Sequence, residues 1–396
     1  MLDINNIRNI CVVGAGIMGQ GIAQVSLMAN YNIMLIDLDE EIVSNGVRKI
    51  EQGLKLIKSK GKLGEDISIS DLMQNCSKST NLDSAVKNAD LVFEAVVEKM
   101  DVKKEVCNKV MSNSPSHCIM ASNTSTFKIS EIAKDAKRPE QVIGMHFFPP
   151  VANQCCVEVM KGEKTSDDVL DLCVAIGKKL PCTKGNRLSV RIEKESPGFI
   201  ANRLLIANTI YTSWIFDQAN EMNIPWEQID ADAGAGWLVP MGPCQMTDYL
   251  GIDVSYNSMK SYEKNVSPDF TPGKLLTKFV KEGNLGKKTG KGFYDWSNGN
   301  PIINFDKKAG LFNPEIHLAI QLNEGCKLIE EGIVSGYKII DEVMLKGTSM
   351  PGPFSAGKRN YQNWSNLLEE IAEKMGKFYL KPCDLMKSGE FIKRRR

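Results

Sequence analysis

The sequence predicts an α/β protein in which a doubly wound parallel sheet is followed by two related all-α domains. Over roughly the first 190 residues, short apolar runs alternate with amphipathic stretches, a rhythm typical of βαβ units. From "SPGFIANRLL" at residue 196 onward, apolar residues recur at helical spacing, with glycine and proline between the segments. A faint duplication in this second half indicates two copies of one helical unit.

Each expected strand is a short apolar run. The runs are "NICVVG", "NIMLID", "ADLVFEAV", "HCIMAS", "QVIGMHF" and "CCVEVM", at residues 9–14, 32–37, 89–96, 117–122, 141–147 and 155–160. Amphipathic periodicity predicts helices over about residues 17–29, 40–60 and 99–112. Because helices alternate with strands, we expect the strands to be parallel and covered by helices.

The duplication divides the helical half. Gly242–Pro243 falls on Gly352–Pro353, and Asp230 lies near Asp341, at a displacement of 110 to 111 residues. A segment rich in glycine, asparagine and proline, "SNGNPIINFDKKAG", separates the two copies as a linker. The expected domains are the sheet domain, a first helical domain and a divergent second helical copy, over residues 1–195, 196–300 and 301–396.

Charge and cysteine content indicate which kinds of partner, and which cellular compartment, to expect. Lysine plus arginine (49) nearly balances aspartate plus glutamate (48), so no overall field attracts nucleic acid or an anionic membrane. No apolar run reaches about 18 residues, so we expect a small-molecule partner, no nucleic acid and no membrane. The eleven cysteines show no paired CxxC spacing, which favours reduced thiols in a cytoplasmic protein. No cluster has metal-ligand spacing, so no metal is expected.

Three glycines separate the first strand from the first helix in "CVVGAGIMGQGIA". Gly14, Gly16 and Gly19 form a GxGxxG motif, and the next strand ends in Asp37, 18 residues after Gly19. Such a turn lets a pyrophosphate approach backbone N–H groups at a helix N-terminus. Because a carboxylate at Asp37 accepts hydrogen bonds from a ribose 2′-hydroxyl and repels a 2′-phosphate, we predict a Rossmann-type domain that binds NAD. A glycine-rich structural turn beside an unrelated acid is the alternative.

One of the three histidines occupies a strand end. His146 lies at the carboxyl edge of the predicted sheet, where ligands gather, whereas His117 and His317 have the sequence context of surface or packing residues. Glu158 stands among apolar residues in "CCVEVM", and a buried carboxylate needs a partner such as a histidine. A salt bridge or a solvent-facing edge position is the alternative for Glu158.

Polar residues also follow the neighbouring strands. Four of them come from "ASNTST": Ser122, Asn123, Thr124 and Ser125. Three more, Glu94, Glu98 and Lys103, follow "DLVF" and either contact a cofactor or cap the next helix. The run of lysines between residues 49 and 62 is either a solvated helix face or a positive patch for an anionic ligand.

Taken together, these motifs resemble the 3-hydroxyacyl-CoA dehydrogenases. "VVGAGIMGQGIAQV", "EAVVEKMDVKKEV", "ASNTST", "MHFFPPV", "VEVMKG", "SPGFIANRLL", "MGPCQMTDYLGIDV" and "NLGKKTGKGFYDW" follow the family order from residue 7 to about 297. The resemblance implies reversible NAD-dependent oxidation of an (S)-3-hydroxyacyl-CoA, in short-chain members 3-hydroxybutyryl-CoA, to the 3-ketoacyl-CoA in fatty acid metabolism. Residues 311 to 391 are similar to the second helical copy of longer members.

The resemblance also implies roles for particular residues. His146 matches the catalytic histidine and Glu158 its paired glutamate. Ser125 and Asn202 match the residues that contact the substrate oxygen, and Lys60 matches a lysine that binds CoA. The implied cofactor contacts are Gly14, Gly16, Ile17, Met18, Gly19, Asp37, Glu98, Lys103, Ser125 and Lys288.

Two positions depart from the family pattern. Pro149 replaces the usual asparagine after "HFF", and Gly53 stands where relatives can offer a hydroxyl to CoA. Alternative functions are an NAD-dependent dehydrogenase of a free hydroxy or sugar acid such as gulonate, and a non-catalytic relative like the lens crystallins. Short members dimerise through the helical domain, so a second copy in one chain is compatible with either a monomer or a homodimer.

Overall fold

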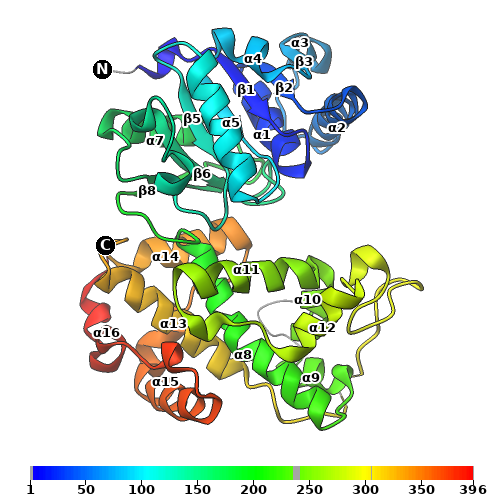
Figure 1. The fold of residues 1–396 in the computed structure, drawn as a ribbon, viewed down its shortest axis with the longest axis vertical. Coiled ribbons are helices and arrows are strands. Elements are labelled where there is room, and N and C mark those ends of the chain that lie inside the picture. Colours follow the sequence, from blue (N-terminus) through cyan, green and yellow to red (C-terminus); the bar gives the residue numbers. More distant parts are fainter. Residues whose placement is uncertain (1–2, 235–240, 305, 396) are drawn as a thin grey trace. The chain divides into compact units, whose positions relative to one another are not determined.

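The computed structural model describes residues 3–234, 241–304 and 306–395, which divide into two compact units. The first unit holds Met1–Phe199 together with Glu342–Ser349, and the second holds Ile200–Asp341 and Met350–Arg396. Among the described residues, the named strands all belong to the first unit, and the second is helical (Figure 1). The predicted fold class is therefore confirmed. The predicted boundaries near residues 195 and 300 remain predictions, and the grouping of Glu342–Ser349 with the sheet was not expected.

An eight-stranded sheet forms the core of the first unit. Its order is β3-β2-β1-β4-β5-β6-β7-β8. The strands are β1 (Asn9–Val13), β2 (Asn32–Ile36), β3 (Cys76–Ser79), β4 (Leu91–Glu94), β5 (Ile119–Ser122), β6 (Val142–Phe147), β7 (Cys156–Lys161) and β8 (Leu188–Ile192). Six of them were predicted; β3 and β8 were missed because "CSKS" has no apolar run and "LSVRI" is interrupted by polar residues.

One strand pair differs from the parallel arrangement that the sequence predicts. All neighbouring strands pair in parallel except β6 and β7, which are antiparallel. The connection between them, residues 148–155, is too short for the crossover that a parallel pair requires. The chain therefore turns straight back after β6 and brings β7 alongside it.

Helices cover both faces of this sheet. They are α1 (Ile17–Met28), α2 (Glu40–Ser59), α3 (Ile69–Gln74), α4 (Leu82–Ala85), α5 (Met100–Asn113), α6 (Ile129–Ile132) and α7 (Asp167–Lys179). The side chain of Asp39 accepts hydrogen bonds from two N–H groups at the start of α2, and Ser166 does so once at the start of α7. The three helices predicted from periodicity thus match α1, α2 and α5.

Successive side chains of β6 and β7 point to opposite faces of the sheet. Met145 and Val157 belong to a buried apolar core that also includes residues of α1, α2 and α7. Because side chains alternate along a strand, His146 and Glu158 point to the other face, on which Gly144 adjoins Ile129 of α6. The two polar side chains are therefore on one face of adjacent strands.

The second unit contains the two helical copies. The first copy comprises α8 (Ala201–Glu221), α9 (Trp226–Ala233), α10 (Pro243–Leu250), α11 (Ile252–Asn265) and α12 (Lys274–Glu282). The second comprises α13 (Pro314–Glu330), α14 (Tyr337–Val343), α15 (Phe354–Met375) and α16 (Asp384–Ser388) (Figure 1). The end of α14 and the π-helix η6 (Met344–Thr348) fall in Glu342–Ser349 and so belong to the first unit. Within the described residues, no helix is long and apolar enough to cross a membrane.

The expectation that every cysteine is reduced is wrong for one pair. Cys155 and Cys182 form a disulfide, with their Cα atoms 5.6 Å apart. The pair joins the residue directly before β7 to the turn after α7, across a separation of 27 residues. Such a spacing carries no local signal, which is why a search for CxxC motifs does not find it.

Candidate active site

The glycine turn between β1 and α1 has the geometry of a phosphate cradle. Gly14 has a φ of 103°, and a Cβ there would lie 2.5 Å from the carbonyl oxygen of Ala95. A Cβ at Gly19 would lie 1.8 Å from the Gly14 oxygen, so a side chain would separate helix and strand. Among the described residues, a Cβ at Gly16, directly before α1, would meet no atom within 4 Å. The turn is therefore tightly packed at Gly14 and Gly19, whereas the space around Gly16 at the N-terminus of α1 is open. A pyrophosphate needs this space to reach the backbone N–H groups.

The carboxylate of Asp37 lies at the end of the neighbouring strand β2. Its Oδ2 accepts a hydrogen bond of 2.7 Å from the N–H of Ala15 in the glycine turn, and its Oδ1 accepts one from Leu38. These bonds fix the carboxylate beside the turn, at the position where a dinucleotide presents its adenine ribose.

His146 and Glu158 are directly opposite each other on β6 and β7. The Nδ1 atom of His146 lies 2.7 Å from Oε2 of Glu158, and both side chains are almost completely buried. An Nδ1–H that donates to the carboxylate leaves the lone pair of Nε2 available to accept a proton. The arrangement can therefore orient a neutral imidazole as a base and stabilise its protonated form.

Two aromatic rings enclose the imidazole. The ring centroid of His146 lies 4.6 Å from that of Phe148 and 5.1 Å from that of Phe199. A Cβ at Gly144 would lie 3.0 Å from the Phe199 ring, so the missing side chain makes room for that ring. Phe199 has a φ of 56°, a conformation that a bulky residue adopts only when its surroundings hold it there.

A carboxylate organises the turn that carries Ser125. The Oε1 atom of Glu98 accepts hydrogen bonds from the N–H of Ser125 at 2.9 Å, from the N–H of Thr126 at 3.1 Å, and from the Thr124 hydroxyl at 2.7 Å. The Ser125 hydroxyl lies 3.3 Å from the same oxygen. Glu98 therefore fixes the backbone of the turn after β5 rather than capping α5, whose N-cap is Lys99.

Lys103 lies beneath this turn in a buried ion cluster. Its Nζ is 2.8 Å from Glu94 and 3.1 Å from Glu98, and its side chain is 1% exposed. Burial alone would raise the pKa of Glu98, but the Lys103 ammonium and the hydrogen bonds from the turn outweigh it and hold that pKa below its usual range. In the structure, Lys103 thus supports the site through the two carboxylates.

Asn123 connects two strand ends. Its side-chain oxygen accepts a hydrogen bond of 2.9 Å from the N–H of Phe147, and its own N–H donates to the carbonyl of Glu94. Because Phe147 directly follows His146, this amide holds the end of β6 against the end of β5.

Sequence reasoning missed Arg187. Its buried guanidinium donates to five carbonyl oxygens, those of Val151, Gln154, Cys156, Leu180 and Pro181. Burial lowers the pKa of Arg187 to about 10. This residue and the nearby disulfide hold the connection between β6 and β7. No motif marks it, because its acceptors are carbonyl groups of any residue type.

The remaining candidates lie further from the imidazole or in the second unit. Lys60 is the exposed C-cap of α2, and a Cβ at Gly53 would lie 2.8 Å from the side chain of Gln24 on α1, so Gly53 faces the neighbouring helix. Asn202 is the second residue of α8. Lys288 forms an ion pair with Asp253 of α11. The predicted roles of these residues remain predictions.

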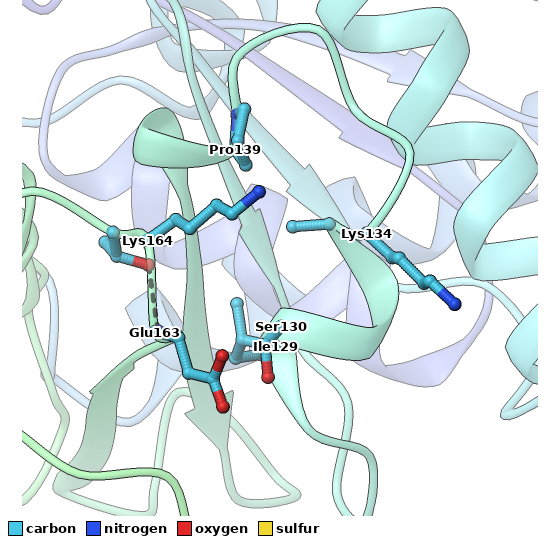
Figure 2. Close-up of a pocket in the computed structure, with 9 residues that line it drawn as sticks. Ile129, Ser130, Lys134, Pro139, Glu163 and Lys164 are labelled. Carbon is cyan, nitrogen blue, oxygen red and sulfur yellow. Dashed lines mark hydrogen bonds between the residues drawn. The ribbon is translucent and has the colours of Figure 1, made fainter.

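A cavity of about 150 Å³ lies elsewhere in the first unit. Its lining includes Ile129, Ser130 and Lys134 on or next to α6, together with residues 162–165 (Figure 2). Thr165 in this lining bonds to the carbonyl of Val142, the first residue of β6, whereas His146 is four residues along, or about 13 Å at the rise of a strand. Figure 2 also shows the Lys134 ammonium directed away from Glu163 and Lys164. We therefore do not assign this cavity to the site.

Comparison with known families gives two matches along the chain. A model described as "3-hydroxyacyl-CoA dehydrogenase, NAD binding domain" matches residues 9–186, and one described as "3-hydroxyacyl-CoA dehydrogenase, C-terminal domain" matches residues 198–296. A probable 3-hydroxybutyryl-CoA dehydrogenase of Bacillus subtilis is 35% identical over 291 residues, which cover 73% of this chain and 98% of that protein. The mitochondrial hydroxyacyl-coenzyme A dehydrogenase of Sus scrofa is 33% identical over 297 residues, covering 73% of this chain and 91% of that protein.

Solved structures extend the comparison. (S)-3-hydroxybutyryl-CoA dehydrogenase from Ralstonia eutropha is 32% identical, with a TM-score of 0.65, and the match covers 74% of this chain and all of that one (100%). A 3-hydroxybutyryl-CoA dehydrogenase from Escherichia coli matches 98% of this chain and 99% of its own with a TM-score of 0.81, at 24% identity. The latter likeness shows that the fold, including the second helical copy, occurs elsewhere.

Proposed function

Because the chain belongs to the 3-hydroxyacyl-CoA dehydrogenase family, and is therefore an NAD-dependent oxidoreductase, we propose that it interconverts (S)-3-hydroxybutyryl-CoA and acetoacetyl-CoA. The observation that carries the proposal is the buried contact of 2.7 Å between His146 Nδ1 and Glu158 Oε2. The names of the bacterial relatives support the four-carbon substrate. In this proposal the His146–Glu158 pair moves the proton of the reacting hydroxyl group.

The proton path follows from the orientation of the imidazole. Nε2 of neutral His146 accepts the proton of the substrate 3-hydroxyl group as the C–H bond at carbon 3 breaks. The carboxylate of Glu158 stabilises the imidazolium that forms and keeps Nδ1 protonated throughout. When bound, NAD supplies the redox chemistry by accepting the hydride. In the reverse direction, His146 returns the proton to the carbonyl oxygen.

The surroundings of the pair support this chemistry. Phe148 and Phe199 exclude water from the imidazole, which strengthens its electrostatic interaction with Glu158. Ser125, on a turn fixed by Glu98, would hydrogen-bond the substrate oxygen as it changes between hydroxyl and carbonyl. We assign a second such hydrogen bond to Asn202.

Cofactor and CoA binding are assigned to separate groups. Backbone N–H groups at the start of α1 would hold the pyrophosphate above Gly16, and Asp37 would accept hydrogen bonds from the adenine ribose. Lys60, exposed at the end of α2, supplies a cation for the phosphates of CoA. The other proposed cofactor contacts are Ile17, Met18, Glu98, Lys103, Ser125 and Lys288.

Substitution of the imidazole tests the proposal. His146→Gln should lower kcat for acetoacetyl-CoA reduction by about a hundredfold or more, because the proton donor is lost. Glu158→Gln should lower kcat as well, since a neutral amide does not stabilise an imidazolium. NADH affinity, measured by fluorescence titration, should stay unchanged. His117→Gln is the matched control, because His117 is exposed and pairs with Asp90 outside the site.

Three results would contradict the proposal. Near-normal turnover by the His146→Gln enzyme would exclude the histidine as the proton-transfer group. Activity with free 3-hydroxybutyrate that free CoA does not inhibit would favour a dehydrogenase of a free hydroxy acid. Absence of turnover with either substrate in the unsubstituted protein would favour a non-catalytic relative.

A further inference from the structure

We propose that Gly347, far along the chain in the π-helix η6, is a positioning residue for the reaction, because it seats the ring of Phe148 against His146. The inference rests on the proposed function, in which His146 transfers the proton. It also gives a catalytic purpose to a segment that lies beyond residues 9–186 and 198–296, the two ranges that the family models match.

Gly347 leaves no space for a side chain. A Cβ at this position would lie 2.9, 3.0 and 3.1 Å from three carbon atoms of the Phe148 ring. Gly347 is buried, and its φ lies outside the left-handed region, so the backbone conformation itself does not demand glycine. The close approach of Phe148 is the feature that excludes a larger residue here.

The Phe148 ring has little freedom to move away. It is 5% exposed, and its centroid lies 4.6 Å from that of the His146 imidazole, at an interplanar angle of 65°. Phe199 packs against the same imidazole at 5.1 Å. A side chain at position 347 would therefore press Phe148 toward His146, and the imidazole would have to shift relative to Glu158 or to the substrate.

Further contacts hold the segment against β7 and against the connection that leads into it. The hydroxyl of Ser349 donates to the side-chain oxygen of Gln154 at 3.2 Å, on the connection between β6 and β7. The π-helix η6 also packs against β7, the strand that carries Glu158. The segment that contains η6 therefore lies close to β7, the strand of Glu158, and also to Phe148.

The geometry predicts an effect on turnover more than on binding. A displacement of about 1 Å in a reacting group can reduce a rate on the order of a hundredfold. The cofactor cradle, formed by the glycine turn and Asp37, lies at the ends of β1 and β2, whereas Phe148 follows β6. Two strands, β4 and β5, separate β1 from β6 in the sheet. Substitution of Gly347 should therefore lower kcat and leave NADH affinity intact.

The test uses graded substitutions in the full chain. Gly347→Ala should lower kcat for acetoacetyl-CoA reduction by about threefold, and Gly347→Val by at least about tenfold, with the dissociation constant for NADH unchanged by fluorescence titration. The matched control is Gly325→Ala. A Cβ at Gly325 would lie 2.6 Å from Phe354 of α15, so this substitution strains the second helical copy without touching Phe148. It should lower the melting temperature and leave kcat unchanged.

A double-mutant cycle isolates the path through Phe148. Phe148→Ala alone should lower kcat, because the imidazole loses one of its enclosing rings. Adding Gly347→Val to Phe148→Ala should cause no further loss, since the new side chain then has no ring to displace. Additive losses would mean that Gly347 acts by another route and would overturn the inference. The cycle also stays informative if Gly347→Val alone proves poorly folded, because Gly347→Ala can replace it.

The outcomes separate the inference from the proposed function. If His146→Gln is inactive while both Gly347 variants turn over normally, the inference fails and the proposed function stands. If His146→Gln retains normal activity, the proposed function itself fails. Equal losses of kcat in Gly325→Ala and Gly347→Val would show a general effect of straining the helical copy, which also overturns the inference.

Discussion

The two helical copies in the second unit preserve the same framework but differ in their polar residues. In the first copy, Asp230 accepts hydrogen bonds from the N–H groups of Cys244 and Gln245 at the start of α10. In the second, Asp341 accepts one from Phe354 at the start of α15. A Cβ at Gly242 or at its counterpart Gly352 would lie 2.5 Å or less from the respective aspartate. The same acid thus caps the same helix in both copies.

The last helix of each copy is capped in a related way. Asp217 on α8 accepts hydrogen bonds from the first two residues of α12, Lys274 and Leu275. Glu330 on α13 accepts one from Leu385 at the start of α16. Since caps of this kind fix where helices begin, their retention explains how the fold survives when most other residues have changed.

The copies diverge where the proposed chemistry lies. Asp248 in the first copy accepts hydrogen bonds from Phe293, Tyr294 and Trp296, and so fastens the hairpin that carries Lys288. Asp248 follows Gly242 by six residues, and at the same distance from Gly352 the second copy has Lys358. A lysine ammonium cannot accept hydrogen bonds, so the second copy cannot hold such a hairpin in the same way. The duplicated unit therefore keeps its structural caps but lacks the acid that holds the hairpin of Lys288, a proposed cofactor contact.

The contact between the copies offers the largest expected effect on stability. Arg203 of α8 is 4% exposed and pairs with Glu324 and Glu331 of α13. Arg203→Met should reduce the free energy of unfolding by about 3–5 kcal/mol, because it leaves the buried carboxylate of Glu324 without one of its cations. Urea denaturation of the full chain measures this. Lys260→Met, which breaks an exposed pair with Glu263, is the control and should cost less than about 1 kcal/mol.

The second position of the first helix distinguishes the copies in activity. It is Asn202 in α8 and Glu315 in α13. Asn202→Ala should lower kcat by about a hundredfold, because the hydrogen bond that we propose between Asn202 and the reacting oxygen is lost. Glu315→Ala should leave turnover unchanged in the same NADH oxidation assay. If the two substitutions had equal effects, the assignment of the site to the first copy alone would be wrong.

The aspartates that cap a helix in each copy, Asp230 and Asp341, allow the most direct comparison, and their loss should have the smallest effect. Asp230→Ala should destabilise the protein by about 2 kcal/mol, since it leaves buried N–H groups without an acceptor. Asp341→Ala should cost about 1 kcal/mol, because Asp341 is less buried than Asp230. Thermal unfolding of both variants checks the order. A larger loss for Asp341→Ala would indicate that the second copy limits the stability of the unit.

Much of the sheet and of the cofactor site could be predicted from the sequence because the signals are local. Apolar runs identified six strands, and the spacing of Gly14, Gly16, Gly19 and Asp37 predicted a turn with the observed conformation. His146 and Glu158 were singled out by their residue types in apolar strands. Their direct contact depends on the pairing of β6 with β7, which periodicity alone does not reveal.

Other parts of the site depend on residues that only the folded chain brings together. The disulfide joins Cys155 to Cys182, and Arg187 binds carbonyl groups from two separate loops. The acidic side chain of Glu98 was expected either to cap a helix or to touch a cofactor; its hydrogen bonds to the turn around Ser125 were not expected, and its contact with a cofactor remains a prediction. The approach of Gly347 to Phe148 spans about half the sequence. Each of these contacts lacks a pattern in neighbouring residues, so sequence periodicity cannot predict it.

The antiparallel pairing of β6 and β7 limits the insertions and deletions that the sequence can accept. His146 and Glu158 form a cross-strand pair only twelve residues apart, so inserting or deleting one residue within either strand would turn one of them to the opposite face. The intervening connection can change its residue types, as Pro149 illustrates, so long as that register is preserved. Natural variation here should therefore appear as substitutions, with insertions confined to places that leave the two strands aligned.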